Sequence, residues 1–354
     1  MTQRPPYPST SFTRTPRVAV IVGCFNQADF VEAAIRSVAL QSHVDFECVI
    51  LDDQSTDGSQ ETIREVLAEM GDDRFRFLER TANGGQMATM MQGFDATSSP
   101  FVAFLDADDF WNRDFLERHV RAHLSRGGIR AISSSDELVV DETGTVLAGG
   151  LPMFRGGDVR RKKGRDRNLF HEVLEGGDTL VFVNRLMPKW RWSTTSGMVF
   201  RRDAIRAMRP LDTEKIRHCA DSYLAPAAHM LGGTVRIEHV LGSYRLHSKN
   251  GWAHQRLFGD ACRMGQAPEA TEKAINTALA ERWCTAAPDL EPQIPRRLMV
   301  RLLVAHIGWA AAFELVASNP EAQKLLGDWA TPTRRRIFDL AGSIPRPLRP
   351  RVLR

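Results

Sequence analysis

FVAFLDADDFW, residues 101–111, runs from five apolar residues into three acids within four positions and ends in two aromatic residues. An apolar run of this kind is typical of a strand that is buried on both faces of a parallel sheet. Carboxylates this close together repel one another, so keeping all of them ionised requires full solvation or a nearby cation. The stretch therefore indicates either a solvated turn or a charged binding site at the end of a strand.

Polar loops also follow three earlier apolar runs. The runs lie at 18–23, 46–51 and 74–79, and the loops GCFNQ, DDQSTDGS and NGGQ lead from them into segments with helical periodicity. Strands that alternate with helices predict a parallel sheet, and ligands of such sheets bind where loops leave the carboxyl ends of the strands. We therefore expect the acidic stretch to lie at the binding edge of a sheet.

The second half of the chain departs from this alternation. Its pattern predicts a strand at 131–135, a hairpin that turns at 142–144, a strand passing into a helix at 198–208 and a strand at 234–247. From about residue 255 the pattern is helical. The predicted fold class is α/β, with a mixed, mainly parallel sheet flanked by helices and a helical C-terminal extension.

Acidic residues near two predicted helices suggest helix caps. Asp29 and Glu32 have the spacing of a capping box. Asp108 or Asp109 would likewise cap a helix at about 112–124, with the other acids solvated. The alternative is a divalent cation, because Mg²⁺ and Mn²⁺ are bound by one or two carboxylates together with water and substrate phosphates. One acid can cap while its neighbours bind metal, so the local pattern leaves both interpretations open.

Composition narrows the function classes further. The formal charge is only +4, although basic residues gather at 155–167 and 334–354, so a dedicated nucleic-acid-binding protein is not favoured. The five cysteines include no CxxC pair, which indicates neither a disulfide framework nor a zinc site and fits a reducing cytoplasm. The first residues lack the apolar core of a secretory signal, and the apolar stretch 302–317 is shorter than the ~20 residues of a membrane span. We therefore expect a cytoplasmic globular protein.

The first loop argues against two other nucleotide-binding classes. A dinucleotide-binding fold requires GxGxxG after the first strand, whereas VGCFNQADF, residues 22–30, contains one glycine. A nucleotidyltransferase would usually carry a glycine-rich first loop with a lysine or arginine, and this loop has no basic residue.

Four segments together resemble the nucleotide-sugar half of the family 2 inverting glycosyltransferases. They are VAVIVGCFNQADFVEAAIRSVALQS, ECVILDDQSTDGS, NGGQ and FVAFLDADD, in the order and spacing of that family, and the resemblance extends over residues 17–250. It implies the glycosyltransferase A fold, an activated sugar donor that is most often a UDP-sugar, and Mg²⁺ or Mn²⁺ at a DxD motif.

The resemblance also implies a division of the chain. A disordered lead at 1–16 would precede a catalytic domain at 17–254, which consists of a nucleotide-binding half at 17–125 and an acceptor half at 126–254. A helical region with a basic tail would follow at 255–354.

Matched residue by residue, the resemblance distributes the nucleotide-binding residues over four loops. Asp53 matches the acid that pairs with the base, where a carboxylate accepts the N3 hydrogen of uracil, which cytosine lacks. Turn formation ahead of STDGS is the structural alternative for Asp53. The other matches are Cys24, Phe25, Asn26, Asn83, Gly84 and Asp106.

The resemblance implies metal ligands and a catalytic base as well. Asp106 and Asp108 match the DxD motif, and His247 matches a histidine that completes the metal and diphosphate site. Asp221 matches the catalytic acid of the ED motif, but Ala220 stands where glutamate is usual. An aspartate near a helix start is often only a cap, which is the alternative for Asp221.

The implied reaction is an inverting, metal-assisted sugar transfer to an acceptor hydroxyl. The segment 193–202 resembles the acceptor loop of the family, with a plain turn as its alternative, and the implied acceptor is a glycan or a lipid-linked molecule. The basic loop at 155–167 would close over the diphosphate or remain a solvated loop, and the arginine-rich tail would touch anionic membrane lipid. The alternative function is a catalytically inactive nucleotide-sugar-binding protein, which Ala220 suggests.

Overall fold

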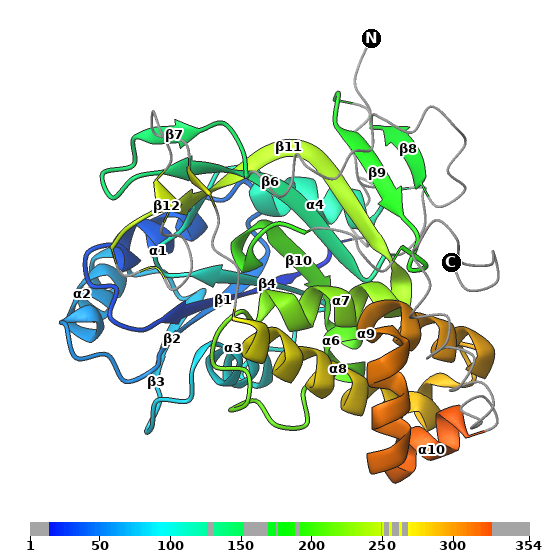
Figure 1. Ribbon diagram of the computed structural model, residues 1–354. Coiled ribbons are helices and arrows are strands. Elements are labelled where there is room, and N and C mark those ends of the chain that lie inside the picture. Colours follow the sequence, from blue (N-terminus) through cyan, green and yellow to red (C-terminus); the bar gives the residue numbers. More distant parts are fainter. Residues whose placement is uncertain are drawn as a thin grey trace.

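The structure is a computed structural model that describes residues 14–125, 130–151, 169–174, 176–187, 192–248, 250, 255–256, 262–263 and 268–327 (Figure 1). The predicted basic loop at 155–167 and the arginine-rich tail at 334–354 lie outside the described residues. Residues 1–13 of the predicted lead also lie outside them.

The first half forms the predicted parallel sheet. Its strands are β1 (Val18–Cys24), β2 (Phe46–Asp52), β3 (Phe75–Glu79) and β4 (Phe101–Asp106), and they lie in the order β3-β2-β1-β4. The connecting helices are α1 (Val31–Ala39), α2 (Ser59–Met70) and α3 (Gln86–Asp95). Side chains of β1 alternate between two cores, since Val20 packs with α1 on one face and Ile21 packs with α3 on the other.

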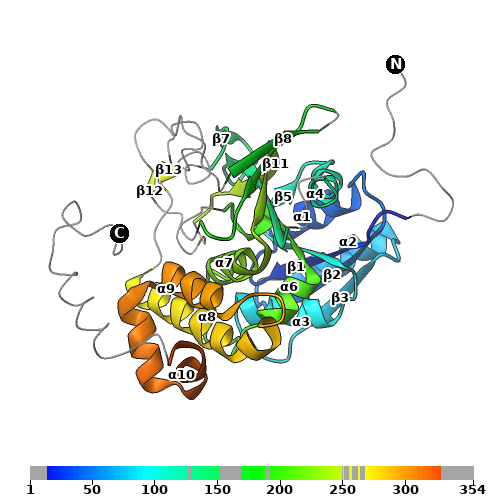
Figure 2. The same ribbon diagram turned by 90° about the vertical axis from the view of Figure 1, so that its right-hand side faces the viewer.

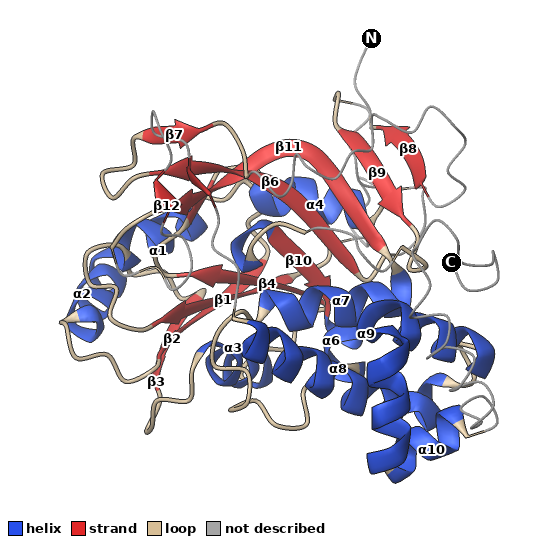
Figure 3. Ribbon diagram, viewed as in Figure 1, coloured by secondary structure: helices blue, strands red, loops and turns tan. Residues whose placement is uncertain are grey.

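The second half extends this sheet with strands of mixed direction (Figure 3). These strands are β5 (Phe110–Trp111), β6 (Ile132–Val140), β7 (Val146–Ala148), β8 (Leu169–Val173), β9 (Thr179–Val183), β10 (Met198–Arg201) and β11 (Thr234–Arg245). β10 lies between β4 and β6 and is antiparallel to both, whereas β11 is parallel to β6. The prediction of a mixed, mainly parallel sheet is confirmed.

The hairpin and the later strand and helix starts lie where the sequence predicts them. β6 and β7 are antiparallel, and the turn between them is closed by hydrogen bonds to the Asp141 carboxylate from the backbone N–H groups of Thr143 and Thr145, each 2.9 Å long. β10 leads directly into α6 (Arg202–Ala207), and α7 (Asp221–Gly232) begins at Asp221. The strand predicted at 131–135 is the first part of the longer β6.

Neither the predicted cap at Asp29 nor the alternative cap at Asp108 or Asp109 forms. α1 starts at Val31 without any side-chain cap, and the N–H groups of Phe30 and Val31 donate to the Gln27 carbonyl at 3.0 Å each. The N–H groups of Gln27 and Ala28 donate to Ser59, at the start of α2, and to Asp57. The helix after the acidic stretch, α4 (Phe115–His123), starts well beyond Asp109, since Phe110 and Trp111 form β5 against β11.

Helices end the described part of the chain. α8 (Glu269–Leu290), α9 (Arg296–Ser318) and α10 (Pro320–Leu326) form a group beside α7, and the predicted helical extension is thereby confirmed (Figure 2). The helical part begins at Glu269, later than the predicted residue 255, because residues 255–256 and 262–263 pair as the short strands β12 and β13. α9 is broken at Gly308, whose φ of 81° is left-handed. Among the described helices, α9 is long enough and apolar enough to cross a membrane, and 44% of its most apolar stretch is buried within the structure.

Candidate active site

The carboxyl ends of β1, β2 and β4 meet at one edge of the sheet. Cys24 pairs with Asp52 across the strands, and Gly23 pairs with Asp106. The loops beyond are also joined, because the Asp53 N–H donates to the Cys24 carbonyl at 2.8 Å. This edge therefore brings the loop after the first strand against both acidic segments, as the sequence predicts.

The loop after β1 is held in an unusual backbone conformation. Asn26 has a φ of +55°, its N–H donates to Ser55 at 2.8 Å, and its side-chain oxygen accepts from the Thr56 N–H at 2.8 Å. Burial raises the pKa of Cys24 to about 12, so its thiol stays protonated and is not a nucleophile. Phe25 next to it is 48% exposed, which leaves an aromatic face open to a flat ligand.

Asp53 organises the loop after β3. Its carboxylate accepts the N–H groups of Gly84 at 2.9 Å and Gly85 at 2.7 Å, and Arg80 pairs with it at 2.8 Å. The Asn83 amide donates to the Asp53 carbonyl at 2.8 Å. The structure thus brings together three predicted residues, Asp53, Asn83 and Gly84, and gives Asp53 a structural task that the sequence did not indicate.

Asp52, the preceding acid, is fully buried. Its Oδ2 atom accepts from the Ser55 N–H at 2.8 Å and from the Gln60 amide at 2.7 Å. Its Oδ1 atom has no hydrogen-bond partner among the described residues. Leaving a buried acceptor unpaired costs about 1–3 kcal/mol, so a bound water or a ligand N–H at this oxygen would be stabilising.

Asp106 and Asp108 lie together at the end of β4. Burial and then the charge of Asp108 raise the pKa of Asp106 to about 7, and the Gln86 amide donates to Asp106 Oδ1 at 3.0 Å. Asp108 Oδ2 lies 2.9 Å from His247 Nε2 and 3.4 Å from the side-chain nitrogen of Asn250. Asp108 therefore contacts His247 and is electrostatically coupled to Asp106, and Asn250 is a residue that the sequence did not point to.

Asp109, the third acid of the stretch, anchors the acidic loop to β11 and to the turn before β10. It is 1% exposed, accepts from the Ser196 hydroxyl at 2.6 Å and from the Arg245 N–H at 2.9 Å, and its pKa is raised well above the usual range by burial. The Arg245 guanidinium donates to the Asp108 carbonyl at 2.9 Å and lies between the rings of Phe30 and Phe110. These contacts hold the backbone of the acidic loop.

A further carboxylate, Glu137 of β6, lies beneath the predicted acceptor loop. It is fully buried, and its Oε2 atom accepts from the hydroxyls of Ser193 and Thr194, the latter at 2.8 Å. Burial raises the pKa of Glu137 to about 7, and its Oε1 atom has no partner among the described residues. The predicted segment, 193–202, contains a short 3₁₀ turn at Thr195–Gly197 and continues through β10 to the start of α6.

Asp221 is the first residue of α7, and it faces the same group of charges. Its charge is one of those that raise the pKa of Asp106. Burial raises the pKa of Asp221 itself, while hydrogen bonds from the backbone N–H groups of Ser222 and Asp221 oppose the shift. The candidate base and the candidate metal ligands are therefore electrostatically coupled.

The predicted metal site consists of few side chains. No group of three or more His, Cys, Asp or Glu side chains in the described part of the chain is placed to hold a metal ion. Mg²⁺ often uses only one or two protein carboxylates and completes its shell with water and phosphate oxygens. The repulsion of Asp106 by Asp108 is the kind of strain that a divalent cation relieves, so these residues fit such an ion.

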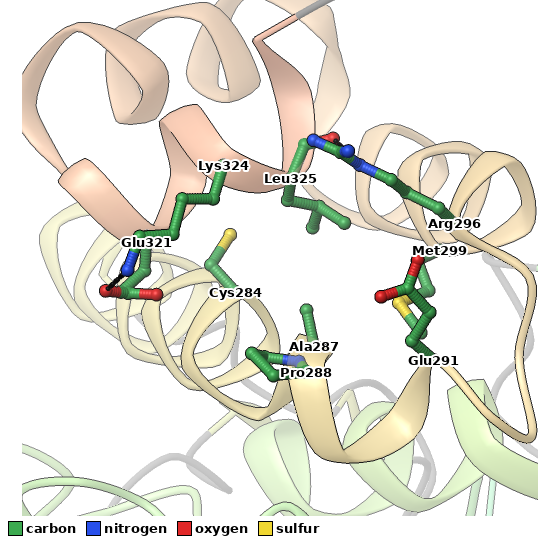
Figure 4. Close-up of a pocket in the computed structure, with 9 residues that line it drawn as sticks. All are labelled: Cys284, Ala287, Pro288, Glu291, Arg296, Met299, Glu321, Lys324 and Leu325. Carbon is green, nitrogen blue, oxygen red and sulfur yellow. Dashed lines mark hydrogen bonds and ion pairs between the residues drawn. The ribbon is translucent and has the colours of Figure 1, made fainter.

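A separate cavity lies elsewhere in the molecule. It has a volume of about 230 Å³ and lies among α8, α9 and α10, lined by residues that include Cys284, Arg296 and Leu325 (Figure 4). None of its lining residues belongs to the strand ends described above. The carboxylate cluster, rather than this cavity, is therefore the candidate active site.

Comparisons with known proteins indicate the family to which the chain belongs. Residues 19–133 match the family model "Glycosyl transferase family 2". An uncharacterized glycosyltransferase of Nostoc sp. is 30% identical over 66% of this chain and 66% of its own length. A putative teichuronic acid biosynthesis glycosyltransferase of Bacillus subtilis, TuaG, is 33% identical over 31% of this chain and 43% of its own length. The matched segment therefore spans about two thirds of the first relative and less than half of the second.

Two further comparisons concern a lipid-linked substrate and the fold. The GalNAc(5)-diNAcBac-PP-undecaprenol beta-1,3-glucosyltransferase of Campylobacter jejuni is 35% identical over 27% of this chain and 30% of its own length. The crystal structure of S. aureus TarS 1-349 in complex with UDP is similar with a TM-score of 0.52 and 15% identity, over 90% of this chain and 82% of that one. At that identity the similarity to TarS shows the fold.

Proposed function

Because this chain belongs to glycosyl transferase family 2 and has the glycosyltransferase A fold, we propose that it moves a sugar from a nucleotide-diphosphate donor to an acceptor hydroxyl. The observation that carries the proposal is the cluster of Asp106, Asp108 and His247 at the strand ends, beside the loop after β1. In this proposal residues 17–254 form the catalytic domain, and residues 255–354 form an extension of it.

The proposed donor is a UDP-sugar. The loop residues Cys24, Phe25 and Asn26 would lie along the nucleoside, with the exposed Phe25 ring as one wall. Asp53 would accept the N3 hydrogen of uracil while also holding Asn83 and Gly84. The unpaired Oδ1 atom of Asp52 offers a second acceptor for the same hydrogen, so the acid pair as a whole favours a base with an N–H donor.

Asp106, Asp108 and His247 would hold Mg²⁺ or Mn²⁺, which when bound would neutralise the negative charge that develops on the departing diphosphate. Asp108 would be kept in orientation by Asn250, and Asp106 by the Gln86 amide. The Asp109 contacts to Ser196 and Arg245 would keep the acidic loop from rearranging as the donor enters.

Asp221 is the proposed general base. Its burial raises its proton affinity, and a carboxylate of raised pKa is a better acceptor for the proton of an attacking hydroxyl. The hydroxyl would attack the anomeric carbon from the face opposite the leaving group, so the configuration would be inverted. Ala220 cannot supply a second carboxylate here, and Glu137 already accepts hydrogen bonds from the hydroxyls of Ser193 and Thr194.

The proposed acceptor is a glycan or a lipid-linked molecule of a cell-envelope polysaccharide. The relative from C. jejuni carries an undecaprenol-linked substrate in its name, and TuaG is named for teichuronic acid biosynthesis. The acceptor would lie against residues 193–202, which Glu137 holds from below. We place the enzyme in the cytoplasm, with the basic C-terminal residues and α9 as the parts that would contact the inner face of the membrane.

A screen of donors tests the proposal. Binding of UDP-, GDP- and dTDP-sugars is measured with and without Mn²⁺ by calorimetry, and release of the nucleoside diphosphate is followed separately. We expect Mn²⁺-dependent binding of UDP-sugars together with slow release of UDP by hydrolysis. Binding without any hydrolysis or transfer would favour the inactive nucleotide-sugar-binding protein, and no binding of any nucleotide sugar would contradict both functions.

A further inference from the structure

Gln86, the first residue of α3, joins the two halves of the candidate active site. Its side-chain nitrogen donates to Asp106 Oδ1 at 3.0 Å, and its side-chain oxygen accepts from the Ala220 N–H at 3.0 Å. The two partners fix the orientation of the amide, because a carboxylate oxygen accepts only from the NH₂ group and a backbone N–H donates only to the oxygen. One side chain therefore links the candidate metal ligand to the residue directly before the candidate base.

The segment before α7 rests on the start of α3. The N–H groups of Gln86 and Met87 donate to the carbonyls of Arg217 and Ile216 at 2.9 and 3.4 Å. Gly85 packs closely against Arg217, since a Cβ atom at Gly85 would lie 2.7 Å from the Arg217 Cα atom. The backbone of this segment is thus tied to α3 at residues 216–217, whereas the bond from Ala220 depends on a side chain.

Cys219 lies between these two attachments in a strained conformation. Its φ is +58°, which costs a non-glycine residue of the order of 1 kcal/mol, and its carbonyl accepts from the Ser222 N–H at 3.0 Å in the first turn of α7. Such a conformation persists only where surrounding contacts fix it. The bond from Ala220 to Gln86 is one such contact, and it lies immediately before Asp221.

We propose that Gln86 is a positioning residue that fixes the N-terminus of α7, and with it Asp221, relative to Asp106. The proposal rests on the proposed function, in which Asp221 is the general base and Asp106 helps to hold the cation. Removing the bridge leaves the contacts of Asp53 with Asn83 and Gly84 in place, although Asp106 loses its donor from Gln86. The start of α7 loses the side-chain contact that precedes the base. Catalytic turnover therefore falls more than donor affinity does.

Two substitutions separate the two ends of the bridge in the full-length protein. Gln86→Met has a similar length and removes both hydrogen bonds. Gln86→Glu keeps an acceptor for the Ala220 N–H and replaces the donor toward Asp106 by a carboxylate oxygen. Gln92→Met is the matched control, because Gln92 lies on the same helix and its side-chain oxygen accepts from Arg80 instead.

Hydrogen exchange of peptides covering residues 216–224 is the structural measurement, and it needs no substrate. We expect exchange near Ala220 to be about tenfold faster in Gln86→Met than in the wild type, and unchanged in Gln86→Glu and Gln92→Met. Equal exchange in Gln86→Met and the wild type would contradict the bridge. This result does not depend on whether the protein binds UDP.

Kinetics supply the second measurement, with the UDP-sugar that the donor screen identifies and with its hydrolysis to UDP as the readout. Gln86→Met is expected to lower kcat by about tenfold or more while KM for the donor stays within about threefold. Faster exchange with an unchanged kcat would make the bridge merely structural and would overturn the proposal. Absence of UDP-sugar binding in the wild type would contradict the proposed function. The exchange result would still show whether Gln86 fixes the start of α7, because it is measured without substrate.

Discussion

Asp108 Oδ2 lies 2.9 Å from His247 Nε2, although the two residues are 139 positions apart in the chain. Asp108 follows the fourth parallel strand, and His247 follows β11, which reaches the same edge of the sheet through the added second half. The His247 ring also lies against Phe30, with ring centroids 4.8 Å apart, ahead of α1. Three separate segments therefore meet around His247, next to the carboxylate that we assign to the cation.

The base assignment predicts a loss of turnover without a loss of donor binding. In Asp221→Asn the side chain keeps its size but cannot accept a proton, so kcat should fall by about 10²–10⁴-fold, the range of general-base contributions. UDP affinity measured by calorimetry should stay within a few-fold of wild type. Asp212→Asn is a suitable control, because Asp212 is an exposed acid that pairs with Lys215 outside the site. A variant at Asp221 with full turnover would exclude this residue as the base.

The acid pair at the end of β2 predicts two different defects. Asp52→Asn changes a carboxylate whose Oδ1 atom is unpaired, whereas Asp53→Asn also disturbs the Gly84, Gly85 and Arg80 contacts. If Asp53 reads the base, Asp53→Asn should lose the preference for UDP over CDP, and Asp52→Asn should keep it. The reverse result would transfer base recognition to Asp52. Competition binding of UDP and CDP to each variant distinguishes these outcomes.

The sequence predicted correctly that the loops after β1, β2 and β4 lie at one edge of the sheet. That prediction depends only on the local alternation of strands and helices. Alternating apolar strands and helices specify a parallel sheet, and the loops that follow such strands necessarily meet at one edge. The family resemblance implied Asp53, Asn83 and Gly84, and in the structure Asn83 and Gly84 both donate hydrogen bonds to Asp53. Their detailed roles in nucleotide binding stay predictions.

The errors arose where partners distant in the chain replace local ones. Asp29 does not cap α1. Ser59 and Asp57, 32 and 29 positions away, accept the N–H groups of Gln27 and Ala28 and so fix the backbone that enters the helix. Asp109 does not cap a helix, because Ser196 and Arg245, 87 and 136 positions away, occupy its carboxylate. Hydrogen bonds across such separations leave no periodicity in the sequence.

Glu137 could not have been found from the pattern of its strand. β6 reads ISSSDELVV, and its polar residues are buried instead of solvated. Ser133 and Ser135 lie 2.7 and 3.2 Å from the ring nitrogens of the buried His119, so the strand satisfies its polar groups internally. An acid in a strand of this kind looks like a residue facing solvent until the packing is known.

Glu137 also gives a testable pH dependence of stability. Its folded-state pKa of about 7 lies above its ordinary 4.5, so the folded protein binds this proton more tightly than the unfolded chain does. The contribution of Glu137 to stability is therefore complete below pH 4.5 and is lost as the pH rises to about 7. Glu137→Gln cannot titrate and should lack this loss.

The measurement is urea unfolding of wild type and Glu137→Gln at several pH values, in EDTA. Between pH 4.5 and 7 the free energy of unfolding of the wild type should fall relative to the variant by up to about 3 kcal/mol. Taking the difference between the two proteins removes the titration of groups that Glu137 does not influence. Asp106 and Asp109, whose pKa values the Glu137 charge raises, contribute to the difference as well. A difference that does not change with pH would show that Glu137 titrates normally in the folded protein.

The central claim is that the acids after β4 hold a divalent cation shared with a nucleoside diphosphate. Calorimetric titration of UDP into wild type, Asp108→Ala and the control Asp73→Ala, each with Mn²⁺ and with EDTA, tests it most directly. Asp73 is an exposed acid in the loop before β3. We predict that Mn²⁺ strengthens UDP binding by about tenfold or more in the wild type and in Asp73→Ala, and that this gain disappears in Asp108→Ala. An equal gain from Mn²⁺ in Asp108→Ala would contradict the claim.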